Sequence, residues 1–494
     1  MTTTSFTQKT IFLVFISILF LSPIISSAQW TQLGFNIDGE AVGDLSGAQI
    51  SLNASGNRIA IGAQENNGNG DNSGHVRIYE WIGTTWMQLG ADIDGEAEGD
   101  QSGISVSMNA VGDRIAIGAT ENDGNGAEAG HVRIYEWNGT SWVQLGGDID
   151  GEAAGDRSGY VSMNASGNRL AIGAGGNDGN GADAGHVRIY DWNGTAWNQL
   201  GADIDGEAAG DISAAVCMNA FGNKLAIGAF LNDGNGTDAG HVRVYEWNGL
   251  AWTQLGADID GEYAGDESGR SISINSSGDR LVIGASKNSM NEIFSGHGRI
   301  YQWDGTSWTQ LGADIDGVSR YNQLGWKVSM NAVGDRIAIG NATDKVRIYE
   351  WNATAWIQRG SDINGELIGD GSGWSISLDS IGDRIGIGAP FNSDNGRNAG
   401  HVRVYQNKPT DIVEIKREKL FSIYPNPANQ EISLETKNKL GESVQITSIT
   451  GAVLLEFNIS KEQEKIDLSN FPNGLYFLKV GGQIQKVVIS KKFN

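Results

Sequence analysis

The sequence predicts an all-β protein built from repeated units. A W-x-Q-L-G-like segment occurs seven times, at intervals of 48 to 56 residues. A second segment, G-H-V-R-[IV]-Y, recurs at a similar spacing and contains all six histidines of the chain. Short apolar runs separated by Gly, Asn and Asp lie between these marks, which is typical of strands divided by tight turns. No segment between residues 30 and 407 has the periodicity of a helix.

Each repeat is expected to contain four strands, named a to d. In the second repeat they are expected at residues 105–109, 114–119, 131–137 and 141–145. The turn between strands c and d contains Asn-Gly, which readily adopts the positive φ angles of a hairpin turn. Seven four-stranded units of about 55 residues predict a seven-bladed β-propeller with antiparallel blades over residues 29–407.

The two ends of the repeat region predict how the ring closes. The region opens with a d-type strand at residues 30–33, and the last repeat stops after strand c at residues 401–405. If the N-terminal strand completes the seventh blade, no strand edge is left unpaired. A β-solenoid is the alternative fold, but a solenoid does not need a repeat that is split between the two ends.

The repeat resembles the FG-GAP class, which is related to the propeller of integrin α-subunits. The resemblance rests on Gly103–Ser107, Arg114–Ala119 and Gly130–Tyr135, and it extends over about 375 residues. It implies a propeller fold. Members of this class bind calcium in an acidic loop between the first two strands. Here that loop is only residues 110–113, so the resemblance does not imply that calcium site.

The N-terminus is predicted to be a signal peptide, residues 1–28. Lys9 precedes an apolar run at Ile11–Leu21, and small residues at 26–28 form a cleavage site. The apolar run is too short to span a membrane, and no other segment is long and apolar enough to do so. We expect an exported chain with no transmembrane segment after processing.

The last 74 residues differ from the repeats. Phe421–Pro427, Gly474–Val480 and the basic residues 491–492 resemble the type A C-terminal sorting domain of type IX secretion. The resemblance implies a small β-sandwich at residues 421–494, after a linker at 408–420. It also implies the type IX secretion machinery as a partner, and a secreted or surface location outside the outer membrane of a Gram-negative, Bacteroidota-type bacterium.

Acidic residues are expected to gather on one face of the propeller. Residues 29–407 hold 22 basic and 49 acidic residues. Because successive strands are antiparallel, the d–a and b–c loops should share one face, and both loop types are rich in Asp and Glu. Nucleic acid is a poor partner for such a face, because its phosphates would be repelled.

The acidic d–a loop, GADIDGEAEGDQSG at residues 90–103, has two interpretations. Asp94, Asp100 and Asp123 would converge on a calcium ion if the two loops meet, since calcium accepts irregular oxygen-rich loops. Alternatively, these residues only form turns, because Asp, Asn and Gly are what tight turns select. Calcium is the one cofactor that the sequence suggests.

Functional residues are expected where one repeat departs from the others. The six histidines recur at one strand position, so we expect them to be a repeated structural device. Two tryptophans lie outside the repeat pattern, and both stand at the start of strand a, in blades six and seven. Tyr160 and Arg270 stand at the same position in other blades, and Arg320 and Tyr321 lie in the atypical d–a loop before blade six. Together with Trp326 and Trp374, these four residues predict a ligand site. The alternative is that the two tryptophans plug the central channel.

The expected function is that of an exported binding or adhesion module that recognises a glycan or a protein through one propeller face. The alternative is a structural or matrix protein with calcium-dependent stability. A glycan-active enzyme is the third hypothesis, and we expect no enzymatic activity. Catalysis of that kind needs a few unique carboxylates at a defined separation, whereas nearly all carboxylates here are repeated.

Overall fold

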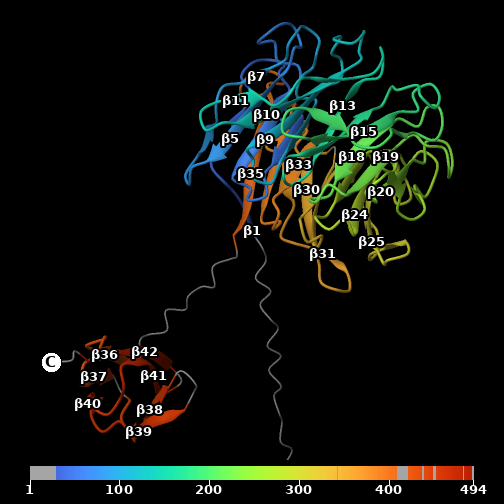
Figure 1. Cartoon of the computed structure of the whole chain (residues 1–494). Coiled ribbons are helices and arrows are strands. Elements are labelled where there is room, and N and C mark those ends of the chain that lie inside the picture. Colours follow the sequence, from blue (N-terminus) through green and yellow to red (C-terminus); the bar gives the residue numbers. More distant parts are fainter. Residues whose placement is uncertain are drawn as a thin grey trace, which may run out of the picture. The chain divides into compact units, whose positions relative to one another are not determined.

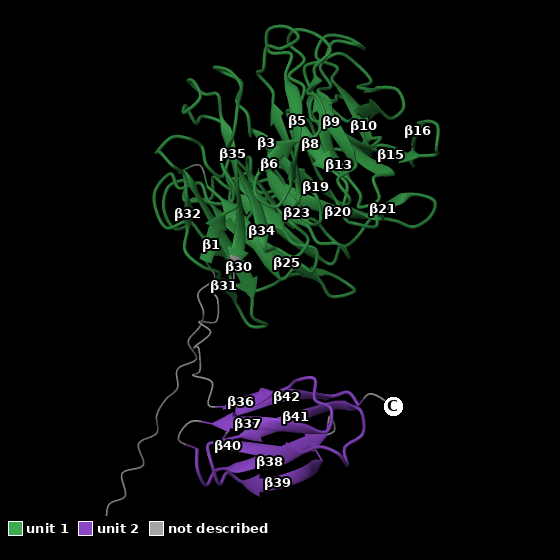
Figure 2. Cartoon of the chain, turned by 90° about the vertical axis from the view of Figure 1, so that its left-hand side faces the viewer, with its two compact units in different colours: residues 1–410 green, residues 411–494 purple. Residues whose placement is uncertain are grey.

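The computed structural model describes residues 29–341, 343–408, 421–436, 439–448, 452–481 and 483–491. The predicted signal peptide and residues 409–420 of the predicted linker lie outside the described residues. The chain divides into two compact units, residues 1–410 and 411–494 (Figures 1 and 2). The described residues form strands and turns without a helix, and so contain no helix that could cross a membrane.

The second repeat shows how each sheet of the first unit is built. Its strands pair antiparallel in the order β11-β10-β9-β8, and a two-residue strand, β12, continues β11 along the same edge of β10. The bounds are β8 (Ser105–Met108), β9 (Arg114–Ala119), β10 (His131–Trp137), β11 (Trp142–Gln144) and β12 (Ile149–Asp150). Strands b and c are therefore confirmed, strands a and d are shorter than predicted, and β12 was not predicted.

Seven such sheets occur in the described residues, and we number them in the chain order of their innermost strands. The first sheet has β3 (Gln49–Leu52), β4 (Arg58–Ala63), β5 (His75–Trp81), β6 (Trp86–Gln88) and β7 (Ile93–Asp94). The third has β13 (Ser158–Met163), β14 (Arg169–Ala174), β15 (His186–Trp192), β16 (Trp197–Gln199) and β17 (Ile204–Asp205). The fourth has β18 (Ser213–Met218), β19 (Lys224–Ala229), β20 (His241–Trp247), β21 (Trp252–Gln254) and β22 (Ile259–Asp260).

The remaining sheets follow the same order. The fifth has β23 (Ser271–Ile274), β24 (Arg280–Ala285), β25 (His297–Trp303), β26 (Trp308–Gln310) and β27 (Ile315–Asp316). The sixth has β28 (Lys327–Met330), β29 (Arg336–Gly340), β30 (Lys345–Trp351), β31 (Trp356–Gln358) and β32 (Ile363–Asn364). The seventh has β33 (Ser375–Leu378), β34 (Arg384–Ala389), β35 (His401–Lys408), β1 (Gln29–Gln32) and β2 (Ile37–Asp38).

The seventh sheet joins the two ends of the repeat region. Strand β1 pairs antiparallel with β35, and β2 pairs with the same strand closer to its start. The Trp30 indole N–H also donates a hydrogen bond to the Arg359 carbonyl in the sixth sheet, at 3.0 Å. The N-terminal strand therefore completes the sheet of the last repeat.

Hydrogen bonds between innermost strands link each sheet to the next. Ser107 Oγ, for example, accepts from the Met163 backbone N–H at 2.9 Å. The equivalent acceptors are Ser51, Ser162, Cys217, Ser273, Ser329 and Ser377. The bond from the Leu52 N–H to Ser377 Oγ, 3.0 Å long, joins the first sheet to the seventh. Figure 1 shows the orange β35 beside the blue strands of the first repeat.

The apolar core of the first unit lies between neighbouring sheets. Strand b of each repeat is almost wholly buried, as in β9, where only the first residue is partly exposed. Val76 and Ile78 of the first sheet, for example, pack with Val106 and Ile117 of the second. Strands buried on both faces have the near-continuous apolar runs that the sequence shows.

The second unit consists of two sheets around one core. The sheets have the orders β36-β37-β40 and β39-β38-β41-β42. The bounds are β36 (Phe421–Tyr424), β37 (Glu431–Thr436), β38 (Ser443–Ser448), β39 (Val453–Asn458), β40 (Gln463–Asp467), β41 (Gly474–Val480) and β42 (Gln483–Ile489). The core includes Phe421, Leu434, Ile446 and Leu478, which come from both sheets.

Candidate functional site

The d–a and b–c loops lie against each other on one face of the first unit. The Gly95 N–H donates to the Gly74 carbonyl at 2.8 Å, and the Gly99 N–H donates to the Asp71 carbonyl at 2.9 Å. The stretch predicted as one continuous acidic loop also contains strand β7, which pairs with the start of β5. Ile93 of β7 is buried, so part of this segment is anchored in the core.

The carboxylates predicted to bind calcium have roles in their own loops. Asp100 is buried, and its Oδ2 accepts hydrogen bonds from the N–H groups of Glu96 and Ala97. Asp123 Oδ1 accepts from the Glu128 N–H at 2.8 Å. The Asp94 side chain is exposed. Two of the three predicted ligands are thus in the positions that the turn interpretation expects.

A cavity of about 730 Å³ opens between the innermost strands and the b–c loops. Four of the six predicted ligand-site residues line it, namely Tyr160, Arg270, Trp326 and Trp374. They come from the third, fifth, sixth and seventh sheets or from the residues just before their innermost strands. Residues at the same position of different repeats are therefore brought to one cavity.

An aromatic pair forms one side of this cavity. The ring centroids of Trp326 and Trp374 are 4.7 Å apart and the ring planes are inclined by 48°. Phe391 meets Trp374 edge to face at 5.1 Å. The Arg270 guanidinium lies 4.9 Å from the Trp326 ring centroid and 5.1 Å from that of Phe230. Both tryptophans stay partly exposed.

Charged groups hold the Arg270 side chain in place. Arg270 Nη1 is 3.1 Å from Glu267 Oε2, and Lys287 Nζ contacts the other oxygen of the same carboxylate at 2.5 Å. Glu267 itself is buried. The guanidinium is therefore oriented by a buried carboxylate and stacked between two aromatic rings, which favours one fixed position.

Lys327 and Cys217 are functional candidates outside the predicted site: Lys327 was not predicted, and Cys217 was expected to be only a small strand residue. Both line the cavity, and Lys327 Nζ donates to Gln49 Oε1 at 3.4 Å. The cavity walls lower the pKa of Lys327, because burial disfavours the charged ammonium, and burial likewise raises the pKa of Cys217. The sequence does contain a signal for Lys327, because it replaces a serine: the equivalent positions of the fifth and seventh repeats hold Ser271 and Ser375.

Arg320 and Tyr321 do not line the cavity. The Arg320 guanidinium lies 5.3 Å from the Tyr321 ring centroid, and this ring is 5.9 Å from that of Phe294. Phe294 belongs to the b–c loop of the fifth repeat, and Tyr321 is 54% exposed. These residues form a separate exposed aromatic group, so the predicted six-residue site divides into two places.

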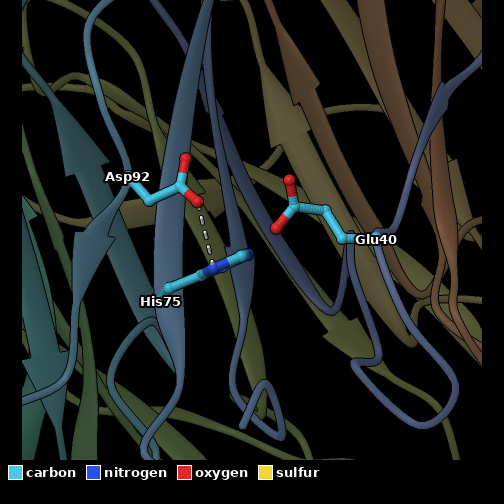
Figure 3. A group of neighbouring side chains, drawn as sticks. All are labelled: Glu40, His75 and Asp92. Atoms are coloured by element: carbon cyan, nitrogen blue, oxygen red, sulfur yellow. Dashed lines mark ion pairs between the residues drawn. The ribbon is translucent and has the colours of Figure 1, made fainter. Parts of the chain in front are cut away.

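A third group was also missed, and it repeats around the unit. Figure 3 shows Glu40 and Asp92 pointing toward His75, whose Nδ1 is 3.9 Å from Asp92 Oδ2. The His75 side chain is almost fully buried, and burial, followed by the Arg77 charge, lowers its pKa. The imidazole is therefore neutral near pH 7. The histidines were expected to be structural, and the carboxylates beside them come from segments far away in the sequence.

Comparisons with known proteins match parts of this arrangement. Hydrazine synthase of Kuenenia stuttgartiensis has a TM-score of 0.51 at 12% identity, covering 76% of this chain and 98% of that chain. This likeness concerns the fold alone and supports a propeller-like architecture for the first unit. Beta-agarase A of Zobellia galactanivorans is 32% identical over 68 residues, which are 14% of this chain and only 13% of that protein.

The C-terminal unit is assigned by a family model. Residues 422–493 match the secretion system C-terminal sorting domain. The beta-agarase match has nearly the same length as this domain. The chain therefore carries a C-terminal sorting domain of type IX secretion, which indicates a secreted or cell-surface protein of a Bacteroidota-type bacterium.

Proposed function

We propose that the first unit is a closed seven-bladed β-propeller of FG-GAP type that binds a glycan at the mouth of its central channel. In this proposal the sorting domain and the predicted signal peptide export the chain, and the propeller then acts at the cell surface or in the surroundings as a binding or adhesion module.

The closed ring is supported by the bonds between innermost strands. Each of the seven sheets carries one acceptor on its innermost strand, and the bond between Leu52 and Ser377 connects the last sheet to the first. Strand β1 completes the seventh sheet from the other end of the repeat region. In a solenoid each repeat contacts only its neighbours along the chain, so the first and last repeats would not meet.

Glycan binding is supported above all by the partly exposed Trp326–Trp374 pair beside Arg270. Ligand sites are concave, mostly apolar, and carry a few fixed polar groups, with volumes of roughly 300–1,000 Å³. The cavity has this size, and its lining combines aromatic and aliphatic side chains with a larger share of polar and charged groups. Sugar rings present an apolar face to aromatic rings and hydroxyls to charged groups, so this combination suits them.

The test is a glycan array probed with the full-length chain, followed by the double variant Trp326→Ala/Trp374→Ala. We expect at least a tenfold loss of affinity for the bound glycans with a nearly unchanged melting temperature. Tyr321→Ala is the matched control, since it removes an exposed aromatic residue outside the cavity and should leave affinity unchanged.

Two outcomes would contradict this function. A large drop in melting temperature in the double variant would show that the tryptophans plug the channel. An array without any bound glycan would remove the glycan proposal, and a surface protein captured through the same tryptophans would then replace it. We also propose that the chain is not an enzyme, and turnover of any polymer on the array would refute that.

A further inference from the structure

Glu, His and Asp side chains meet at equivalent places in the first four repeats, and in the fifth repeat Asp266 takes the place of the equivalent aspartate. In each group, one nitrogen or oxygen atom from each of the three residues lies within 4.8 Å of the other two. The groups are Glu40–His75–Asp92, Glu96–His131–Asp148, Glu152–His186–Asp203, Glu207–His241–Asp258 and Glu262–His297–Asp266. The histidine begins strand c; in the first four groups the carboxylates come from the d–a loops on either side of it, whereas Glu262 and Asp266 both come from the preceding loop.

The histidines are buried polar side chains without a hydrogen-bond partner. Their side chains are at most 2% exposed, and Nε2 of all six has no partner within the described residues. Nδ1 of each points at a carboxylate oxygen 3.6–3.9 Å away, which is too far for a hydrogen bond. In the seventh repeat, where Asn36 replaces the aspartate, Nδ1 of His401 is also buried and unpartnered.

These distances fit ligands that stand around a cation. Ligand atoms bound at 2.0–2.1 Å in tetrahedral geometry lie about 3.3 Å from one another. His186 Nδ1 is 3.9 Å from both Glu152 Oε2 and Asp203 Oδ2, so each of these two distances would have to shorten by about half an ångström. The carboxylates remain partly exposed, which leaves a path for the ion from solvent.

An arginine orients the glutamate of each group. In the second repeat, Glu96 Oε1 is 3.6 Å from Arg133 Nη1, and its other oxygen, Oε2, is 3.7 Å from His131 Nδ1. The same guanidinium donates a 2.7 Å hydrogen bond to the Asp94 carbonyl, which fixes its place. Groups that orient the ligands from behind are a usual part of metal sites in proteins.

The sixth repeat supports the need for a positive charge at this place. There the glutamate is replaced by Val318 and the histidine by Lys345, so two members of the group are lost together. The aspartate is kept as Asp362, and Lys345 Nζ lies 3.9 Å from its Oδ2. The permanently charged ammonium of Lys345 thus stands where the other repeats have a histidine that faces two carboxylates.

We propose that the Glu–His–Asp groups bind divalent cations of the zinc class. The histidine supplies Nδ1, each carboxylate supplies one oxygen, and a fourth position stays open to water. A nitrogen ligand with two carboxylates suits zinc, whereas calcium prefers oxygen ligands alone. These sites are separate from the predicted calcium ligands, and the proposal does not depend on glycan binding.

Each ion would connect two neighbouring sheets. Glu40 follows β2, which belongs to the seventh sheet, whereas His75 lies on β5 of the first sheet. Because the ion binds the folded chain only, zinc should raise the melting temperature. Because the groups repeat around the unit, the stabilisation by zinc should decrease in steps as the groups are removed one at a time.

The experiment measures zinc bound per chain after chelation, using equilibrium dialysis of the full-length protein against Zn²⁺ and elemental analysis. His131→Lys, which copies Lys345, should lower the bound zinc by one ion per chain, and Glu96→Gln replaces it if that variant does not fold. Val318→Glu/Lys345→His should raise the number by one, since Asp362 is already present. Asp123→Asn is the control for loss of an unrelated carboxylate on the same face.

Two results would overturn the proposal. One is a zinc stoichiometry that is the same in His131→Lys, Glu96→Gln and Asp123→Asn, because zinc would then be attracted only by the acidic face. The other is displacement of all bound zinc by an equal concentration of Ca²⁺, which would rule out sites selected by the histidine nitrogen.

Discussion

Replacing one serine of the inter-sheet series should weaken the contact between two blades by a predictable amount. Ser107→Ala removes the acceptor of the Met163 N–H, which now makes a 2.9 Å bond to Ser107 Oγ. A hydrogen bond contributes about 0.5–1.5 kcal/mol net, and a buried donor left without a partner costs about 1–3 kcal/mol. This bond is only partly buried, so water can take over part of the acceptor's role.

We therefore expect Ser107→Ala to lower the free energy of unfolding by about 1 kcal/mol. In a domain of this size that corresponds to a melting temperature about 2 °C lower. Cys217 provides the opposite change, because its sulfur is a weak acceptor for the Ile274 N–H at 3.3 Å. Cys217→Ser should restore the serine of the other repeats and raise the melting temperature slightly.

Differential scanning calorimetry of the full-length chain measures both changes. Ser141→Ala is the matched control, since Ser141 Oγ accepts only an exposed hydrogen bond in a turn, from Asn138. Its effect should stay within about 0.5 kcal/mol. Equal effects of Ser107→Ala and Ser141→Ala on the free energy of unfolding would refute the reasoning. A loss of stability in Cys217→Ser would refute it as well. In either case the serine hydroxyls would contribute nothing specific to the contact between neighbouring sheets.

Three further predictions concern the ring, the cavity and calcium. Deletion of residues 29–38 should expose the edge of β35 and produce dimers or aggregates on size-exclusion chromatography, whereas an unchanged monomer would contradict ring closure. Because Lys327 has a lowered pKa in the folded chain, the unfolded chain binds more protons between that pKa and 10.5, and stability should rise with pH there. Lys327→Met should raise the melting temperature at pH 7 and remove this rise, as thermal unfolding at several pH values would show. Millimolar calcium should raise the melting temperature relative to magnesium if Asp94, Asp100 and Asp123 bind it, and no shift would leave them as turn residues.

Much of the fold could be predicted because its signals are local and repeated. Strand c begins at His131 and ends at Trp137 as predicted, since both residues mark the same places in other repeats. The two-residue strand β7 could not be predicted, because one buried isoleucine between aspartates has no strand periodicity. It forms through pairing with β5, which is contributed by a segment 17 residues earlier.

The candidate sites show the same division between local and distant signals. Trp326 and Trp374 could be placed together because both depart from the repeat at one position, and equivalent positions of several sheets line one cavity. Lys327 departs in the same way and was not predicted, because a single lysine in a strand is usually a solvated residue and the sequence does not show that it faces a cavity. The Glu–His–Asp groups were missed for a different reason, since a residue present in nearly every repeat was interpreted as structural.

The cavity and the Glu–His–Asp groups lie on the same side of the repeat strands, so their roles have to be separated by experiment. Glu121 and Phe230 of the b–c loops line the cavity, and the b–c loops are hydrogen-bonded to the d–a loops that carry the proposed zinc ligands. If zinc only links neighbouring blades, chelation should lower the melting temperature and leave glycan affinity unchanged at a temperature where the chain stays folded. If zinc also fixes the loops around the cavity, chelation should weaken glycan binding, and Val318→Glu/Lys345→His should make that binding more sensitive to zinc. Because the double tryptophan variant changes neither a zinc ligand nor its loop, it should bind as much zinc as the wild-type chain in both cases.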